Sequence, residues 1–283
     1  MYNRCIDRMI RTLVIYCLIS LSASSMAQET STLELLKKES ELQSLFQILY
    51  SDTLSAFGPV LDQIQEIMPD ALAEEGAMEF TWSKLDRIGV ISSDDGNVRI
   101  FTWHVMEDPD HYRYYGYIQM NLKRDQIRVF ELKDNLKPQR NLNRLEQSPE
   151  NWFGKLYYQI IAETYKRDTY YTLMGMDFNN SRSTIKTIET ISIHRRMPRF
   201  EQGMYLVGNN QQDRMVLEYS SQVSISVRYD PAIRMITYDH LEPLHPVYRN
   251  NFEFYGPDGS IDGLQFTDGA WIFVRDIDAR NSN

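Results

Sequence analysis

The chain of 283 residues carries 30 Lys and Arg against 39 Asp and Glu, which gives a net charge of −9 at pH 7. A net acidic surface disfavours nucleic acid and anionic membranes as partners, because both attract clusters of Lys and Arg. A chain of this length buries enough apolar surface to be stable without disulfides, as one large domain or as one domain with a helical appendage.

Residues 1–27 have the three parts of a secretory signal peptide. Three arginines form the basic start, an apolar run covers residues 13–19, and small residues lead to a cleavage site between Ala27 and Gln28. The apolar run is shorter than the ~20 residues that span a bilayer, so we expect cleavage and no membrane insertion afterwards. Both cysteines, Cys5 and Cys17, are lost with this segment. The sequence therefore predicts a periplasmic or secreted protein without thiols.

Residues 28–76 predict a hairpin of two helices. The sequence Ser31-Thr32-Leu33-Glu34 fits a capping box, in which the Ser hydroxyl and the Glu carboxylate satisfy backbone donors at a helix start. Gly58-Pro59 breaks the chain and starts the second helix, which Pro69 is expected to end. Each helix has one apolar stripe, formed by Leu35, Leu42, Leu45, Phe46 and Leu49 in the first and by Val60, Leu61, Ile64, Ile67 and Met68 in the second. We expect these narrow stripes to pack on the β domain or on another protein.

Residues 77–283 predict a β domain, because apolar residues alternate with a period of two along most of this region. The sequence Asp94-Asp95-Gly96-Asn97 is typical of a tight hairpin turn, in which Gly adopts a positive φ without strain. Polar turns are also expected at residues 123–125 and 166–168, and a long loop is expected from Lys133 to Glu150. The expected strands cover residues 87–92, 98–104, 112–120, 126–132, 155–164, 169–176, 184–193, 214–219, 224–229, 235–238, 252–255, 264–266 and 271–274.

About a dozen short strands, joined mostly by hairpin turns and without alternating helices, predict a mainly β fold. We expect an antiparallel meander, a sandwich-like domain or a propeller-like array, preceded by the short helical hairpin. Tyrosines are frequent on the expected strands and include the pairs Tyr157-Tyr158 and Tyr170-Tyr171. They suit packing in the core and across strands, and they also suit a sheet face that stacks on sugars or anchors a partner.

The segment from residue 239 to residue 245 gathers two carboxylates and two imidazoles: Asp239, His240, Glu242 and His245. Such groups can ligate a transition metal or supply an acid–base pair, although their spacing matches no zinc signature. Two prolines in and after the segment predict an extended loop. We take these four residues as the candidate binding residues and expect no bound metal or other cofactor.

The segment Asp258-Gly259-Ser260-Ile261-Asp262-Gly263 resembles the start of a calcium-binding loop, with oxygen ligands at the first, third and fifth positions. The twelfth position should be Glu and is Gly269, and the flanking residues predict strands rather than helices. Two Asp-Gly turns that join strands explain the same residues. The turns are the favoured interpretation, and calcium binding is the alternative.

Familiar catalytic motifs are absent from the sequence. It contains no G-x-S-x-G nucleophile elbow, no H-E-x-x-H zinc helix, no glycine-rich phosphate loop and no dinucleotide fingerprint. A pair of carboxylates of the kind used by glycosidases has no local sequence signature, so this type of hydrolysis stays open.

Five segments spread over the β region are distinctive: Ser93–Trp103, Tyr170–Asp177, Val227–Asp230, Tyr238–Pro243 and Gly256–Gly259. Together they resemble a group of uncharacterised exported proteins from Bacteroidota. The resemblance implies a periplasmic or secreted β-rich protein. It carries no activity and no catalytic residue across to this chain.

These observations favour a non-enzymatic exported protein that binds a protein or glycan partner. The β domain would present its tyrosines, and the helices would dock a partner. The alternative is a hydrolase of polysaccharide or peptidoglycan that uses carboxylates together with His240 or His245. A third possibility is a scaffold that calcium stabilises at Asp258 to Asp262.

Overall fold

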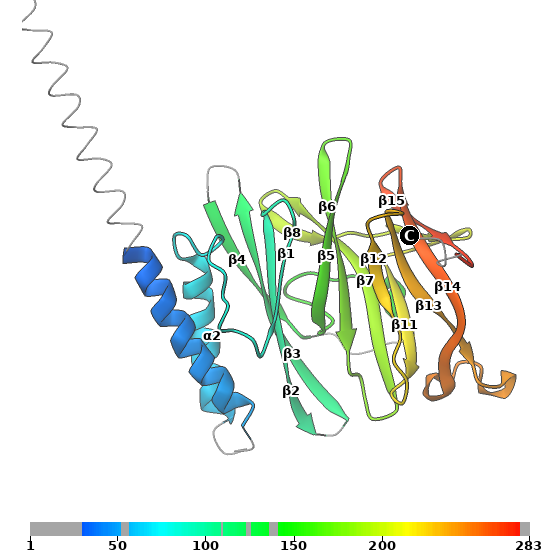
Figure 1. Cartoon of the computed structure of the whole chain (residues 1–283), viewed down its shortest axis with the longest axis horizontal. Helices are drawn as coiled ribbons and strands as arrows, with labels where there is room; N and C mark the ends of the chain where they lie inside the picture. Colours follow the sequence, from blue (N-terminus) through cyan, green and yellow to red (C-terminus); the bar gives the residue numbers. More distant parts are fainter. Residues whose placement is uncertain (1–29, 52–56, 109, 123–125, 136–140, 278–283) are drawn as a thin grey trace, which may run out of the picture. The chain divides into compact units, whose positions relative to one another are not determined.

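The computed structural model describes residues 30–51, 57–108, 110–122, 126–135 and 141–277 (Figure 1). The expected signal peptide, with both cysteines and the cleavage site at Ala27 and Gln28, lies outside the described residues. The chain divides into two compact units, with the boundary between Asp86 and Arg87. The structure is mainly β, with 51% of residues in strands and 19% in helices. Among the described residues, no helix is long and apolar enough to cross a membrane.

The helical unit is an antiparallel hairpin, as predicted. Its first helix is described from residue 30 to residue 49, and the second helix, α2, covers Phe57–Ala73. Lys38 joins the two, because its Nζ lies 3.0 Å from Oε2 of Glu74 and 3.4 Å from the carbonyl oxygen of Asp70. Most of the predicted stripe residues are buried, namely Leu35, Leu42, Leu45, Phe46, Val60, Leu61, Ile64 and Met68.

Two predicted helix ends are wrong. The capping box at Ser31 is not formed, because the helix already includes residue 30 and the Ser31 hydroxyl donates to the carbonyl of Glu75. Pro69 lies inside α2 rather than at its end. A proline removes one backbone hydrogen bond at this point. The turn that follows fully buries Ala71 and Leu72, and this burial favours continuing the helix.

Residues 77–86 belong to the helical unit and pack back on its helices. The buried Trp82 donates from its indole nitrogen to the carbonyl of Ala77 at 3.2 Å. The backbone nitrogen of Lys84 donates to Oε1 of Glu39 at 2.9 Å. Glu39 is only 1% exposed, so this bond supplies a donor that a buried carboxylate requires.

The β unit consists of three sheets. The first sheet is a meander of β1 (Gly89–Ser92), β2 (Val98–Asp108), β3 (His111–Leu122) and β4 (Gln126–Lys133). The middle sheet has the order β11-β7-β6-β5, formed by β5 (Leu156–Tyr165), β6 (Asp168–Asp177), β7 (Ser183–His194) and β11 (Arg214–Ser220), and β8 (Met197–Phe200) pairs with β7. The third sheet has the order β10-β9-β15-β14-β13-β12, formed by β9 (Tyr205–Val207), β10 (Asn210–Gln212), β12 (Val227–Asp230), β13 (Met235–Pro243), β14 (Tyr255–Thr267) and β15 (Ala270–Val274). Among these named strands, which lie in the described part of the chain, the pairings are antiparallel except for that of β15 with β9.

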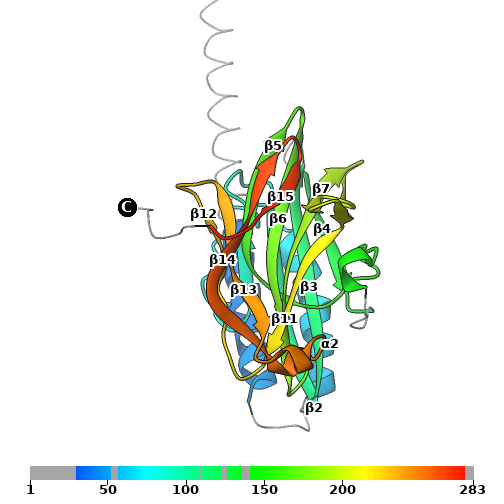
Figure 2. The same cartoon turned by 90° about the vertical axis from the view of Figure 1, so that its right-hand side faces the viewer.

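The middle sheet is buried on both faces, because successive side chains of a strand point to opposite sides. On β6, Tyr171 and Leu173 pack in a cluster with Ile118 of the first sheet. Met174, which follows Leu173, packs instead with Ile236 of the third sheet. Figures 1 and 2 show the three sheets as successive layers. Of the predicted architectures, the structure has the sandwich-like one, preceded by the helical hairpin.

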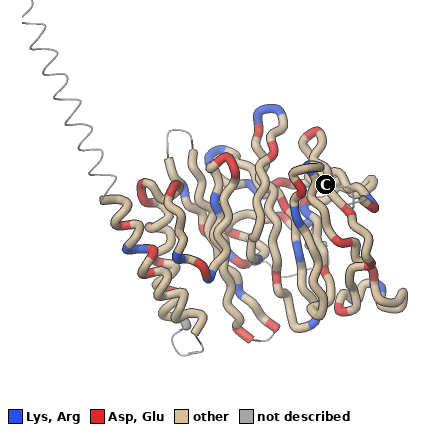
Figure 3. Tube along the Cα trace, viewed as in Figure 1, with Lys and Arg blue, Asp and Glu red and all other residues tan. Residues whose placement is uncertain are grey.

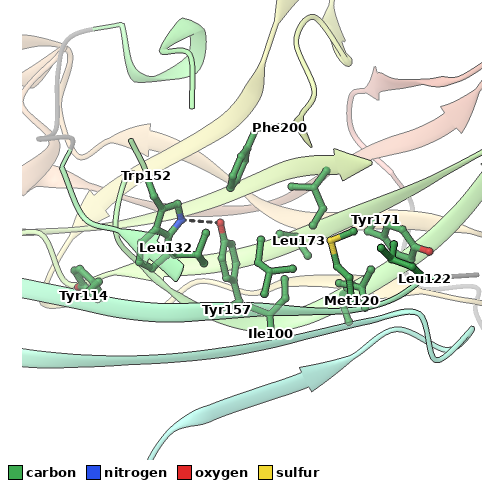
Figure 4. Packing of buried hydrophobic residues seen from close by; sticks show 14 residues of the cluster. Ile100, Tyr114, Met120, Leu122, Leu132, Trp152, Tyr157, Tyr171, Leu173 and Phe200 are labelled. Carbon is green, nitrogen blue, oxygen red and sulfur yellow. Dashed lines mark hydrogen bonds between the residues drawn. The ribbon is translucent and has the colours of Figure 1, made fainter. Parts of the chain in front are cut away.

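The cluster between the first and middle sheets is closed by the loop that joins them (Figure 4). A loop is predicted from Lys133 to Glu150; Lys133 is the last residue of β4, and the described residues 134–135 and 141–150 lie outside the named strands and include a short 3-10 helix, η2 (Leu142–Arg144). Just beyond it, Trp152 is fully buried, and its indole nitrogen donates to the hydroxyl of Tyr157 at 3.0 Å. The segment that follows the loop is therefore part of the core.

A buried ionic cluster fixes the same loop. Glu189 on β7 accepts hydrogen bonds from Lys155 at 2.8 Å and from Arg214 at 3.1 Å, and all three side chains are at most 2% exposed. The Gln147 side chain of the loop also donates to Glu189, at 2.5 Å. Burial lowers the pKa of Lys155. Burial alone would raise the pKa of Glu189, but the two cations outweigh it and hold that pKa below its ordinary value. These charges link the loop to β7 and β11.

Short strands account for the main errors in the predicted elements. The sequence does not predict β8, β9 or β10, which have only 4, 3 and 3 residues. A strand was expected over residues 252–255, but residues Phe252–Phe254 form a 3-10 helix, η4, before β14 begins. The strand expected at residues 264–266 is one part of β14, which is 13 residues long.

Candidate functional site

The predicted site residues lie mainly on a strand rather than in a loop. β13 continues to Pro243 and pairs with β14, with Leu241 opposite Pro257 and Glu242 opposite Gly256. The expectation of an extended loop is therefore wrong up to Pro243. A proline is tolerated at this point because it is the last residue of the strand and removes no bond from the middle of the sheet.

His240 occupies an irregular point of β13, where the register with β14 shifts between Asp239 and Leu241. Its Nδ1 lies 2.6 Å from Oδ2 of Asp262 on β14, and its Nε2 lies 3.3 Å from Oε1 of Glu242. The hydrogen bond to Asp262 raises the pKa of His240 above its ordinary value. Asp262 is only 4% exposed, so a buried carboxylate orients the ring. An oriented imidazole of this kind can hold and transfer a proton.

The other two predicted residues have separate contacts. Oδ2 of Asp239 accepts from the backbone nitrogen of Ser226 at 2.7 Å. His245 precedes the 3-10 helix η3 (Pro246–Tyr248), and its Nδ1 accepts from the backbone nitrogen of Val247 at 3.3 Å. Of the four candidates, the structure brings together His240 and Glu242, and it adds Asp262 from the segment that resembles a calcium loop.

The carboxylates of that segment are directed to internal donors. Oδ1 of Asp258 accepts from the backbone nitrogen of Ser260 at 2.9 Å and from its hydroxyl at 2.7 Å. Asp262 binds His240 with one oxygen and accepts from the backbone nitrogen of Asp276 with the other, at 3.1 Å. β14 runs through the segment, so two turns that join strands are not formed here. Within the described residues, no group of three or more His, Cys, Asp or Glu is placed to hold a metal ion.

A cavity of 550 Å³ opens at the ends of several strands of the first and middle sheets, and we call it the strand-end cavity. The first sheet contributes Asn97 from the β1–β2 turn and Asn121 from β3. The middle sheet contributes Arg167 from the β5–β6 turn, Tyr170 and Tyr171 from β6, and residues at the end of β7 and from β8. Sites for small molecules typically have volumes of about 300–1,000 Å³. The strand-end cavity is within this range.

The β1–β2 turn holds one wall of the strand-end cavity in place. Oδ2 of Asp95 accepts from the side-chain nitrogen of Asn97 and from the hydroxyl of Tyr171, each at 2.8 Å. Oδ1 accepts from the Ser93 hydroxyl at 2.6 Å and from the backbone nitrogen of Asn97 at 3.0 Å. Partial burial acts to raise the pKa of Asp95, but these hydrogen bonds outweigh it and the pKa lies below its ordinary value.

Another part of the lining contains a paired charge. Nη2 of Arg199 lies 2.7 Å from Oε1 and 2.9 Å from Oε2 of Glu201, and Nε lies 3.0 Å from Oε1. The hydroxyl of Ser192 on β7 also donates to Glu201. A guanidinium and a carboxylate in this forked arrangement fix each other's orientation. This part of the lining is therefore defined before any ligand binds.

A smaller cavity of 320 Å³ lies elsewhere in the β unit. It is lined by the turns at Ser181 and Ser221 and by Leu244 and Phe254, from the segment between β13 and β14. Neither cavity includes His240 among its lining residues.

The strand-end cavity was not predicted from the sequence. The sequence predicts parts of the cavity lining one by one, since turns are expected at residues 94–97 and 166–168 and Tyr170-Tyr171 is an aromatic pair on an expected strand. Nothing in the sequence indicates that these turns meet, because this depends on the stacking of two sheets. Comparison with protein-family models, with curated proteins and with solved structures finds no match to this chain.

Proposed function

We propose that this chain is an exported, non-enzymatic protein that binds a glycan in the strand-end cavity. One observation carries the proposal: a 550 Å³ hollow lined by tyrosine and by planar polar side chains. A tyrosine offers a sugar both an apolar ring face and a polar tip. The amide, carboxylate and guanidinium groups of Asn, Asp and Arg provide donors and acceptors for the hydroxyl groups of the sugar. The export itself rests on the sequence of residues 1–27.

Preorganisation of the lining supports binding. Asp95 holds both Asn97 and Tyr171, and Glu201 holds Arg199. Side chains that are already fixed lose little conformational freedom when a ligand binds, and the affinity for the ligand is higher because this entropic cost is small. The walls are thus suited to recognition of one ligand shape.

The same geometry favours binding over hydrolysis in this cavity. A glycosidase presents two carboxyl groups to the glycosidic bond. The cavity is lined by Asp168 and Glu201, but both oxygens of Glu201 are engaged by Arg199. One carboxylate of the possible catalytic pair, that of Glu201, is therefore bound by a side chain of the protein and is not offered to a ligand.

Titration calorimetry of the purified protein with a panel of oligosaccharides tests the proposal. The Asn121→Trp variant places a bulky side chain in the lining of the strand-end cavity, and Asn210→Trp adds the same side chain at an exposed position on β10. We expect at least one oligosaccharide to bind, Asn121→Trp to abolish this binding, and Asn210→Trp to retain it. Absence of binding across the panel, or equal binding by Asn121→Trp, would contradict the proposal.

A second candidate function is hydrolysis of a glycan or of peptidoglycan near His240. It is favoured by the 2.6 Å hydrogen bond between His240 and the buried Asp262, because this bond orients an imidazole for proton transfer. The test is the release of reducing ends from polysaccharide and peptidoglycan by wild type and by His240→Gln. Release that depends on His240 would replace the non-enzymatic proposal.

A further inference from the structure

Basic side chains gather around the strand-end cavity, although the chain has a net charge of −9. The β5–β6 turn supplies Lys166 and Arg167, and the β7–β8 turn supplies Arg195 and Arg196, all of them exposed. Figure 3 shows basic residues at the tip of the β5–β6 hairpin. Arg167 lines the cavity directly, as does His194 at the end of β7.

The carboxylates around the cavity are mostly engaged by internal donors. Glu201 is paired with Arg199 through contacts of 2.7 to 3.0 Å, so these two charges offset each other. Asp95 accepts four hydrogen bonds from its own turn and from Tyr171. Among the lining residues, this leaves the carboxylate of Asp168, while Arg167 and His194 line the same cavity.

Among the described residues, no carboxylate pairs with the arginines of the two turns. Within the described part of the chain, neither Arg167 nor Arg195 forms an ion pair, and Arg196 donates to the neutral amide of Gln126. Guanidinium groups bind carboxylate, sulfate and phosphate oxygens through two parallel hydrogen bonds. The rim of the cavity therefore has cationic donors that are available to an anionic ligand.

The backbone of the β7–β8 turn adds an independent argument. Arg195 has a φ of 49° and Arg196 a φ of 67°, so two consecutive non-glycine residues adopt the left-handed conformation. A hairpin turn of this kind favours Asn and Gly, which adopt it at lower cost. Strain of this sort is typically retained where a side chain has a use. The turn thus places two arginines where other residues would be more stable.

From these observations we propose that the ligand of the strand-end cavity is an acidic saccharide, which carries a carboxylate or a sulfate group. This inference rests on the proposed glycan-binding function. Arg167 would bind the anionic group within the cavity, and Arg195 and Arg196 would raise the local concentration of the ligand through their field. The sugar rings would contact the tyrosine and asparagine side chains of the walls.

The test compares three trisaccharides of equal length by titration calorimetry with the purified protein: one of galactose, one of galacturonic acid and one of sulfated galactose. We expect the acidic trisaccharides to bind at least about tenfold more tightly than the neutral one, as charge-assisted hydrogen bonds contribute that much. The affinity for the acidic trisaccharides should fall as the salt concentration rises from about 50 to about 500 mM, because salt screens the attraction between exposed charges. The carboxylated and sulfated probes distinguish the two kinds of anionic group.

Variants test whether Arg167 causes the preference for acidic trisaccharides. Arg167→Gln should weaken binding of the acidic trisaccharides about tenfold and should weaken binding of the neutral one by a clearly smaller factor, because only the acidic probes lose a charge-assisted contact. Arg228→Gln, a matched change at an exposed arginine of β12, should alter neither. Equal affinity for neutral and acidic probes would overturn this inference while the glycan-binding proposal stands. Failure of all three probes, together with the wider panel, would overturn both.

Discussion

Tyr171 donates its hydroxyl to Oδ2 of Asp95 at 2.8 Å, which links a strand of the middle sheet to the β1–β2 turn of the first sheet. The two residues are 76 positions apart in the chain. Tyr171 is otherwise buried in the cluster between these sheets. This contact joins the core to the wall of the strand-end cavity, so the stacking of the sheets and the shape of the cavity depend on each other.

Replacement of Asp95 should therefore affect binding more than stability. Asp95→Ala removes the acceptor for Asn97 and Tyr171, and we expect a loss of about 1 kcal/mol in the free energy of unfolding. We also expect weaker binding of the glycan, because both wall side chains lose their anchor. Calorimetry and urea unfolding measure the two effects. Asp94→Ala, the neighbouring exposed residue, serves as the control and should change neither.

The buried ionic cluster should be essential for stability. Glu189→Gln removes the carboxylate that compensates Lys155 and Arg214, so we expect the free energy of unfolding to fall by about 3–5 kcal/mol, or the cooperative transition to be lost. Urea unfolding at pH 7 measures this. Glu146→Gln makes the same change at an exposed position of the loop and should stay within about 0.5 kcal/mol of wild type. A similarly small effect at Glu189 would show that the cluster carries no such role.

Asp177 on β6 predicts a pH dependence of stability. Burial raises the pKa of Asp177 to about 6, above the ~3.9 of an unfolded chain. Folding therefore favours the protonated form, so the contribution of Asp177 is fully present below about pH 4 and is lost as pH rises through 6. The shift corresponds to about 3 kcal/mol.

The Asp177→Asn variant tests this directly, because the amide keeps an acceptor for the backbone nitrogen of Asn179, which donates at 2.8 Å. The difference in the free energy of unfolding between the variant and wild type should rise by about 3 kcal/mol from pH 4 to pH 7, in favour of the variant. Most of this rise should occur below about pH 6.5, where the carboxyl group of the wild type loses its proton. For the exposed Asp94→Asn control, the difference from wild type in the free energy of unfolding should not change with pH. A flat difference for Asp177→Asn would mean that its carboxylate is not destabilised by burial.

The leader makes a prediction about the exported protein. If residues 1–27 are a signal peptide, the protein recovered from outside the cytoplasm begins at Gln28. Intact mass and N-terminal sequencing of that protein measure this. Recovery of a chain that still contains Cys5 and Cys17 would contradict export with cleavage.

The sequence predicts local structure well in this chain, since hairpins depend on residues that are close together. The turn at Asp95-Gly96 and the alternation on both sides of it are sufficient for β1 and β2. β9 cannot be predicted from the sequence, because three residues are too few to show an alternation of apolar and polar side chains. The strand forms through its pairing with β15. Pro69 does not end α2, because the buried residues after it keep the chain helical.

The candidate site was harder to predict than the fold. The sequence places His240 and His245 close together, but the strand holds the first against Asp262 and the 3-10 turn holds the second against Val247. The partner of His240 lies 22 residues away, and its approach depends on the register between β13 and β14. The strand-end cavity needs the stacking of two sheets, which no local pattern records.

Binding of a glycan in the strand-end cavity is tested most directly by amide chemical-shift mapping by NMR during a titration. The panel oligosaccharide that binds most tightly is added to the labelled protein, and shifts are followed at Asn97, Arg167, Tyr171 and His240. We expect the first three to shift in proportion to ligand and His240 to stay constant. Shifts confined to His240 and its neighbours would contradict the account and favour the second candidate function.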